Sequence, residues 1–215
     1  VPPTLVSFAV DVAKEKDIIT PELKHAGSRL VFFHIEKDAY DLPDYEQVMK
    51  LYDTVHAMIQ NGIIVSAYAL DAKGLAAAVS KMAFGNKLGV TIDASVSKEI
   101  MFAPGFGNIV AEVAADQVAA AEKLMADAGL SADFAVVGEV NDKQQFIYGD
   151  AVITMDEALN AWTATLEKVF PTRATEEKDE IKTGLYNTDK VYVCKNKVAK
   201  PTVFIPVFPG TNCEY

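Results

Sequence analysis

The sequence predicts an α+β fold, in which helices pack on a mixed β-sheet to form an α/β sandwich. Strand-like and helix-like segments alternate along the chain, and several of the strand-like segments are joined by short connections. Short connections join antiparallel strands, whereas parallel neighbours need a longer crossover, so a mixed sheet is favoured over a doubly wound one. Half of the 215 residues are hydrophobic, which is enough for a sizeable core in one domain.

Apolar periodicity places the expected elements. Strands are predicted at residues 4–12, 29–36, 63–70, 87–92, 100–102, 108–113, 134–140 and 145–148, the last two as a pair. Helices are predicted at residues 44–60, 75–84, 116–128 and 155–169, with a helical turn at 20–23. Asp44 and Thr154 are expected N-caps, because Gln47 and Glu157 follow three residues later with the spacing of a capping box. Asp116 is a third expected cap.

The composition changes after residue 172. Residues 173–182 are highly charged and show no apolar period, which indicates a domain boundary near 172–200. We therefore expect a domain at 1–172, a linker at 173–200 and the start of a further domain at 201–215. Residues 190–194 are predicted as a short strand, and 202–208 as an apolar strand before the turn at Pro209 and Gly210. These ends suggest a piece of a longer polypeptide.

Charge and cysteine content exclude several classes of protein. The net charge of −10 argues against a nucleic-acid surface, which needs clustered cations. No apolar run reaches the 18 or so residues of a membrane helix, so we expect a soluble chain with no membrane partner. Cys194 and Cys213 cannot form a disulfide framework or a four-ligand zinc site, and a cytoplasmic location is expected.

The turn from Leu70 to Gly74 is the strongest local candidate for a binding site. It lies where a predicted strand ends and a predicted helix begins, and N–H groups at helix N-termini attract anions. Lys73 would add positive charge, so the turn could hold a phosphate or a carboxylate. The alternative is an ordinary capped turn in which Asp71 accepts the backbone donors.

Other polar or glycine-rich features have simpler interpretations. The loop at residues 104–107 could bring backbone close to a ligand, although a hairpin loop is the favoured explanation. His25, His34 and His56 lack the spacing of metal ligands and are expected at the surface or the edge of the core. The residues alone therefore predict a domain with a weak anion site and no reaction.

Seven segments together resemble one enzyme family. They are residues 2–10, 21–30, 42–46, 55–59, 81–90, 161–172 and 206–215, the last with the sequence PVFPGTNCEY. In these segments the chain resembles the large, single-chain form of phosphoribosylformylglycinamidine synthase, the glutamine-dependent ligase of purine synthesis. The last segment resembles the opening strand of that enzyme's glutaminase domain.

The resemblance implies a fold and a reaction. Residues 1–172 would be the C-terminal subdomain of the second aminoimidazole-ribonucleotide-synthetase-like half, a layered α/β sandwich with partial ferredoxin-like topology. The whole enzyme would use ATP and Mg²⁺ to phosphorylate the formyl-amide oxygen of its small-molecule substrate, and glutamine-derived ammonia would displace that phosphate. Most of that machinery would lie in the remaining domains of the same polypeptide, so this chain alone is expected to bind no cofactor and to be inactive. Cys213 matches a cysteine of the first-strand loop and is not expected to be catalytic.

The candidate substrate residues follow from the same resemblance. Such domains carry Asp-x-Ser-x-Gly-Gly before this helix, whereas here the turn lacks the Ser and one glycine. Ser66, Asp71, Lys73 and Gly74 are the residues expected at the cleft-facing edge, and no catalytic or metal-binding residue is predicted.

Two other interpretations remain open from the sequence. The chain could be a non-catalytic packing or interaction domain of a larger assembly, as the lost glycine suggests. It could also be a stand-alone relative similar to selenophosphate- or thiamine-phosphate-kinase-like proteins, against which the PGTNC segment argues.

Overall fold

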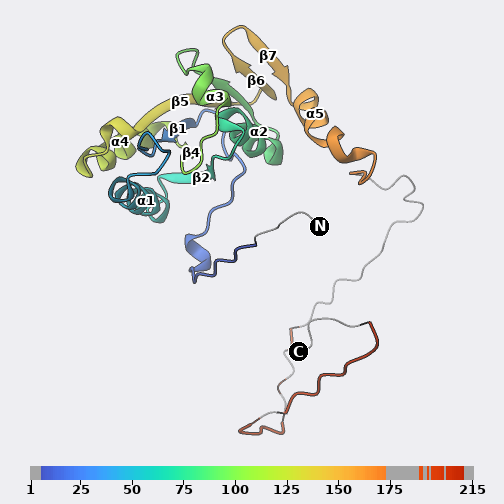
Figure 1. The fold of residues 1–215 in the computed structure, drawn as a ribbon. Helices are drawn as coiled ribbons and strands as arrows, with labels where there is room; N and C mark the ends of the chain where they lie inside the picture. Colours follow the sequence, from blue (N-terminus) through green and yellow to red (C-terminus); the bar gives the residue numbers. More distant parts are fainter. Residues whose placement is uncertain (1–5, 173–188, 191–192, 194, 201, 211–215) are drawn as a thin grey trace. The chain divides into compact units, whose positions relative to one another are not determined.

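A computed structural model describes residues 6–172, 189–190, 193, 195–200 and 202–210 of the chain (Figure 1). It divides into two compact units, Val1–Thr172 and Arg173–Tyr215. In the described part, every helix and strand belongs to the first unit. None of the described helices has the length and apolar character needed to cross a membrane.

The first unit contains a mixed sheet flanked by helices. Its strands are β1 (Arg29–Phe33), β2 (Ile64–Ala69), β3 (Gly89–Ile92), β4 (Ile109–Val113), β5 (Phe134–Asn141), β6 (Gln145–Tyr148) and β7 (Ala151–Thr154). Its α-helices are α1 (Tyr45–Gln60), α2 (Gly74–Asn86), α3 (Lys98–Phe102), α4 (Val118–Asp127) and α5 (Met155–Glu167). Short 3₁₀ turns occur at η1 (Glu15–Asp17), η2 (Ala115–Gln117) and η3 (Ser131–Asp133).

The strand order is β2-β4-β1-β5-β3-β6-β7. All neighbouring strands are antiparallel except β3 and β6, which run parallel. The sheet is therefore mixed, and the predicted α+β fold is confirmed. Strands that are adjacent in sequence are often separated in the sheet: β5 and β6 were expected to pair, but β3 lies between them.

Both faces of the sheet contribute to the hydrophobic core, because successive side chains of a strand point to opposite sides. On β1, Leu30 and Phe32 belong to one hydrophobic cluster, whereas Val31 and Phe33 belong to the other. The first cluster includes residues of α2, α3 and α5, and the second includes residues of α1 and α4. Helices thus cover both faces, as Figure 1 shows, which gives the α/β sandwich.

The predicted N-caps of α1 and α5, Asp44 and Thr154, are present in the structure. The Asp44 carboxylate accepts the N–H groups of Glu46 and Gln47 at N–O distances of 2.9 and 3.1 Å. The Gln47 amide does not complete a capping box: it donates to the His34 carbonyl and accepts from Glu36 N–H. This glutamine is buried beside β1, where unpaired backbone groups are costly. At α5, by contrast, Thr154 and Glu157 form the complete capping box.

Two predictions near the N-terminus are wrong. Of the expected strand at 4–12, the described residues 6–12 form neither helix nor strand, because no other strand pairs with them. The helical turn expected at 20–23 is absent. This stretch is held instead by contacts across the domain, such as the hydrogen bond from Leu23 N–H to the Met82 carbonyl.

Three further elements differ from the prediction. Residues 100–102 lie in the helix α3, because the Ser97 hydroxyl accepts Ile100 N–H and caps it. Asp116 lies inside η2 and caps nothing. Strand β7 was not predicted, since it is only four residues long and its last residue, Thr154, is also the N-cap of α5. Its strand partner in the described part of the chain is β6.

The strand predicted at 202–208 is not formed in the structure. The described residues 202–210 form no helix or strand, and most of their large apolar side chains are exposed. Of the expected strand at 190–194, residues 191, 192 and 194 lie outside the described part of the chain, as does Cys213.

Candidate functional site

A cavity of about 420 Å³ opens at one end of the central strands. It lies where β1 and β2 end and where β4 and β5 begin, with α3 and the following loop beside it. Its lining residues are Phe32, His34, Leu70, Glu99, Ile100, Ala103, Pro104, Gly105, Asn108, Ala132, Asp133, Phe134 and Ala135. Mostly apolar walls with a few polar groups are typical of small-molecule sites.

Asn108 connects the segments that form the cavity. Its side-chain Oδ1 accepts Ile35 N–H at 2.9 Å, which fixes the chain after β1. Its backbone carbonyl accepts Leu70 N–H at 2.9 Å, and its own N–H donates to the Gly105 carbonyl at 3.0 Å. Asn108 therefore fixes the ends of β1 and β2 and the loop before β4 relative to one another.

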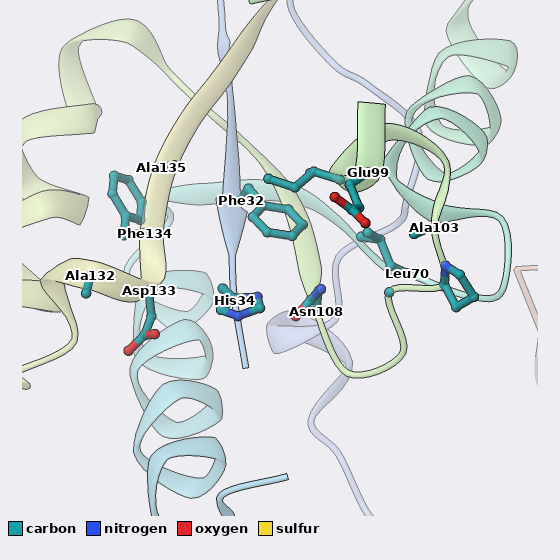
Figure 2. A pocket seen from close by; sticks show the side chains of 13 residues that line it. Phe32, His34, Leu70, Glu99, Ala103, Asn108, Ala132, Asp133, Phe134 and Ala135 are labelled. Atoms are coloured by element: carbon teal, nitrogen blue, oxygen red, sulfur yellow. The ribbon is translucent and has the colours of Figure 1, made fainter. Parts of the chain in front are cut away.

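The polar side chains come from separate elements. Figure 2 shows Glu99 of α3 and Asp133 of η3 on opposite sides of the cavity, with Phe32, His34 and Asn108 between them. The His34 ring stacks on Phe32, with ring centroids 6.3 Å apart, and its backbone N–H donates to the Asp133 carbonyl. His34 itself is exposed, as are His25 and His56. In the described residues, no group of three His, Cys, Asp or Glu side chains is arranged to hold a metal ion.

Asp71, Lys73 and Gly74 lie together in the turn before α2, directly beside this cavity. Leu70 lines the cavity, and the carbonyl of Asp71 accepts Gly105 N–H at 3.0 Å. The Asp71 carboxylate accepts Lys73 N–H at 2.8 Å and pairs with the ammonium group of Lys81 at 2.9 Å. The carboxylate therefore occupies a backbone donor of the turn, as in the alternative interpretation of an ordinary capped turn.

The ion pair shifts the pKa values of both Asp71 and Lys81. The hydrogen bond from Lys81, followed by that from Lys73 N–H, lowers the pKa of Asp71. The hydrogen bond to Asp71, followed by that to the Tyr68 hydroxyl, raises the pKa of Lys81. Lys81 also lies over the Tyr68 ring, 5.3 Å from its centroid. Both groups of the pair are consequently charged at neutral pH, and Lys73 is the exposed cation of the turn.

Gly74 is enclosed by backbone. Its φ of +70° is in the left-handed region, and a Cβ added there would lie 2.7 Å from the carbonyl oxygens of both Met101 and Ala103. The first residue of α2 therefore faces two carbonyl groups.

Ser66 lies apart from the turn. It is fully buried on β2, and its hydroxyl donates to the Pro21 carbonyl at 2.9 Å. The structure thus groups three of the four predicted substrate residues, and substrate binding by any of them stays a prediction. The loop at 104–107 is not a hairpin, because it joins α3 to β4, and two of its residues line the cavity.

Sequence reasoning did not single out Glu99, Asn108 or Asp133. Each directly precedes apolar residues, and polar residues at such positions are common in ordinary turns. The only usable signal was positional: Asn108 is the first residue of a predicted strand, and Asp133 directly precedes another.

The comparison with protein families matches residues 21–150 to the AIR synthase related protein, C-terminal domain. Among curated proteins, the chain is similar to the phosphoribosylformylglycinamidine synthase subunit PurL of Lactobacillus helveticus, with 24% identity over 131 residues. It is also similar to the PurL subunit of Corynebacterium ammoniagenes, with 28% identity over 116 residues. These alignments cover 60% and 52% of this chain but only 16% and 15% of the relatives, so the chain spans about one sixth of their length.

Solved structures support the fold. Thermotoga maritima PurL complexed with FGAR superposes with a TM-score of 0.56 and 13% identity, covering 67% of this chain and 30% of that one. The same protein complexed with AMPPCP gives a TM-score of 0.58 and 15% identity, covering 83% of this chain and 32% of that one. At this identity the likeness concerns the fold alone. The match of residues 21–150, more than half of the sequence, shows that the chain belongs to the AIR synthase related protein family and contains its C-terminal domain.

Proposed function

We propose that this chain is the AIR-synthase-type C-terminal domain of a phosphoribosylformylglycinamidine synthase. That ligase would convert formylglycinamide ribonucleotide to formylglycinamidine ribonucleotide, with ATP as the energy source and glutamine as the amido donor. The observation that carries the proposal is the family match over residues 21–150, joined to similarity with two PurL subunits.

The domain would act as one wall of a cleft and would not perform the chemistry alone. Ammonia release, ATP binding and Mg²⁺ binding would then belong to the remaining domains of the same polypeptide. The relatives' greater length supports this division, because about five sixths of each lies outside the matched region. In the large single-chain form that we propose, residues 173–200 would be a linker and 201–215 would begin the glutaminase domain.

The cavity beside the Asp71 turn is the best candidate for the substrate-facing edge. Its largely apolar lining, with His34 and Asn108 among the polar groups, would suit the uncharged part of a ribonucleotide, and the exposed Lys73 would attract its phosphate. ATP, Mg²⁺ and glutamine would be bound elsewhere in the enzyme, and nucleic acid and membranes would not be partners.

A structural role of the turn is the second candidate. Its support is the set of internal contacts already made there: Asp71 pairs with Lys81, and the backbone of Gly74 meets two carbonyl groups. On this alternative the turn would shape the domain without touching substrate.

Turnover measurements test the proposal. The intact polypeptide that contains this chain should form product from ATP, glutamine and formylglycinamide ribonucleotide, whereas the isolated chain should form none. Lys73→Ala in the intact enzyme should raise KM for the ribonucleotide, and Lys123→Ala, which removes an exposed cation of α4, should not. Turnover by the isolated chain would refute the division of labour, and an unchanged KM for Lys73→Ala would favour the structural role.

A further inference from the structure

The N-terminal segment at residues 6–12 has the sequence pattern of a β-strand. Large apolar side chains occupy Val6, Phe8, Val10 and Val12, and small or polar residues stand between them. An alternation of period two places all four apolar side chains on one face of an extended chain. Such a pattern is typical of a strand with one buried face.

In this structure that face is in solvent. Phe8 is 88% exposed, Val10 is 95% exposed and Val12 is 94% exposed. Figure 1 shows the stretch before η1 drawn without helix or strand. No pairing of the seven strands includes residues 6–12. Among the described residues, the first that packs against either core cluster is Ile19.

The domain's own contacts keep the following stretch in place. Ser66 binds the Pro21 carbonyl, and the buried Glu112 carboxylate accepts Lys24 N–H at 2.6 Å and His25 N–H at 2.8 Å. The chain is thus fixed to its domain from about residue 19 onward. Residues 6–12 precede the matched family region at 21–150 and take no part in the core that this region forms.

Physical chemistry disfavours leaving this segment uncovered. An unpaired apolar strand exposes both its backbone hydrogen-bonding groups and its side chains, and it can pair with any open sheet edge. Adding a strand to such an edge satisfies the backbone groups and buries alternate side chains. The partner of residues 6–12 must therefore be a sheet edge that lies beside an apolar surface.

We propose that residues 6–12 form a strand on the β-sheet of a neighbouring domain of the same polypeptide, with Val6, Phe8, Val10 and Val12 buried in that domain. The identity of the polypeptide rests on the proposed function. We choose a neighbouring domain as the partner because of the length of the relatives. They extend over about six times the matched part and so contain further domains. The segment would then be a covalent strap that ties this domain to its neighbour.

Hydrogen exchange of the backbone amides is the test. In the isolated chain, the amides of residues 6–12 should exchange at the rate of an unstructured peptide. In the intact polypeptide they should exchange at least about 100-fold more slowly, as expected for a paired strand. Unprotected amides in the intact polypeptide would overturn the proposal. Protection in the isolated chain that grows with concentration, together with dimers in sedimentation, would also overturn it in favour of a second copy.

Paired variants separate the two faces of the strand. The double variant Phe8→Asp and Val10→Asp should abolish the protection in the intact polypeptide, whereas Ser7→Asp and Ala9→Asp, on the opposite face, should preserve it. In the isolated chain, both double variants should unfold at the temperature of the wild type, because Phe8 and Val10 are exposed there. Equal effects of the two double variants on protection would contradict the assignment.

These measurements distinguish a failure of the strand proposal from a failure of the proposed function. Ligase activity of the intact polypeptide with unprotected residues 6–12 would refute the strand alone. Protection without ligase activity would refute the proposed function and leave the strand standing.

Discussion

The ammonium group of Lys81 lies 2.9 Å from the Asp71 carboxylate, so a residue in the middle of α2 holds the turn that precedes this helix. The same carboxylate accepts Lys73 N–H, and the Asp71 carbonyl accepts Gly105 N–H. The turn is thereby fixed between its own helix and the loop that lines the cavity. The backbone position of Lys73 is consequently fixed by its hydrogen bond to Asp71.

Asp71→Asn should lower stability at neutral pH and leave it unchanged in strong acid. Because folding lowers the pKa of Asp71 from its ordinary value of 3.8, the pair stabilises the fold above that value. The contribution is lost as the pH falls through the lowered pKa of the folded state. Urea unfolding of both proteins between about pH 7 and pH 2 measures the difference. Asp53→Asn, at an exposed position of α1, is the control, and a difference that stays constant into acid would contradict the ion-pair account.

Glu112→Gln should destabilise the domain by about 1–3 kcal/mol. Glu112 is fully buried on β4, and its carboxylate accepts two backbone N–H groups, from Lys24 and His25. A glutamine brings an NH₂ donor to a site that offers two donors, so one of them loses a good partner. Chemical denaturation measures the loss, with Glu122→Gln on the exposed surface of α4 as the control. Equal stability of the two variants would show that the carboxylate does not anchor this segment.

Gly74→Ala should cost more than Gly62→Ala, although both glycines have a φ of +70°. The strain of a left-handed alanine is common to both changes, and it is about 1–2 kcal/mol. Only at Gly74 would the new Cβ also meet carbonyl oxygens, since nothing lies within 4 Å of the corresponding position at Gly62. The difference between the two unfolding free energies isolates the contact with Met101 and Ala103. If the two variants lose the same unfolding free energy, the loop after α3 moves away freely and does not constrain the turn.

Asn108→Ala should cost about 1–3 kcal/mol and increase hydrogen exchange at Ile35. The side-chain Oδ1 of Asn108 is the acceptor for Ile35 N–H, and Ile35 is buried, so water does not readily replace it. The readout is the exchange rate of the Ile35 amide together with the unfolding free energy. Asn160→Ala, at an exposed position on α5, should change neither. Unchanged exchange at Ile35 would remove Asn108 from its organising role at the cavity.

Local features of the fold could be predicted from the sequence because they depend on neighbouring residues. Asp44 and Thr154 cap their helices through hydrogen bonds that span two or three residues. Gln47 has the same spacing as Glu157, yet its amide binds backbone beside β1. The spacing between the cap and Gln47 cannot show that the Gln47 side chain has hydrogen-bond partners elsewhere in the chain.

Non-local features escaped prediction for the same reason. Residues 6–12 have a strand pattern without a partner in the described structure, and β6 pairs with β3 rather than with the adjacent β5. The cavity depends on this strand order as well. It brings together His34, Asn108 and Asp133, which come from three separate parts of the sequence, and no spacing relates them.

Growth of a purine auxotroph that lacks phosphoribosylformylglycinamidine synthase tests the central claim most directly. The gene for the intact polypeptide should restore growth without added purines, and a gene for the 215-residue chain alone should not. Restored growth with the isolated chain, or failure of a well-expressed intact polypeptide, would contradict its assignment as one domain of this ligase.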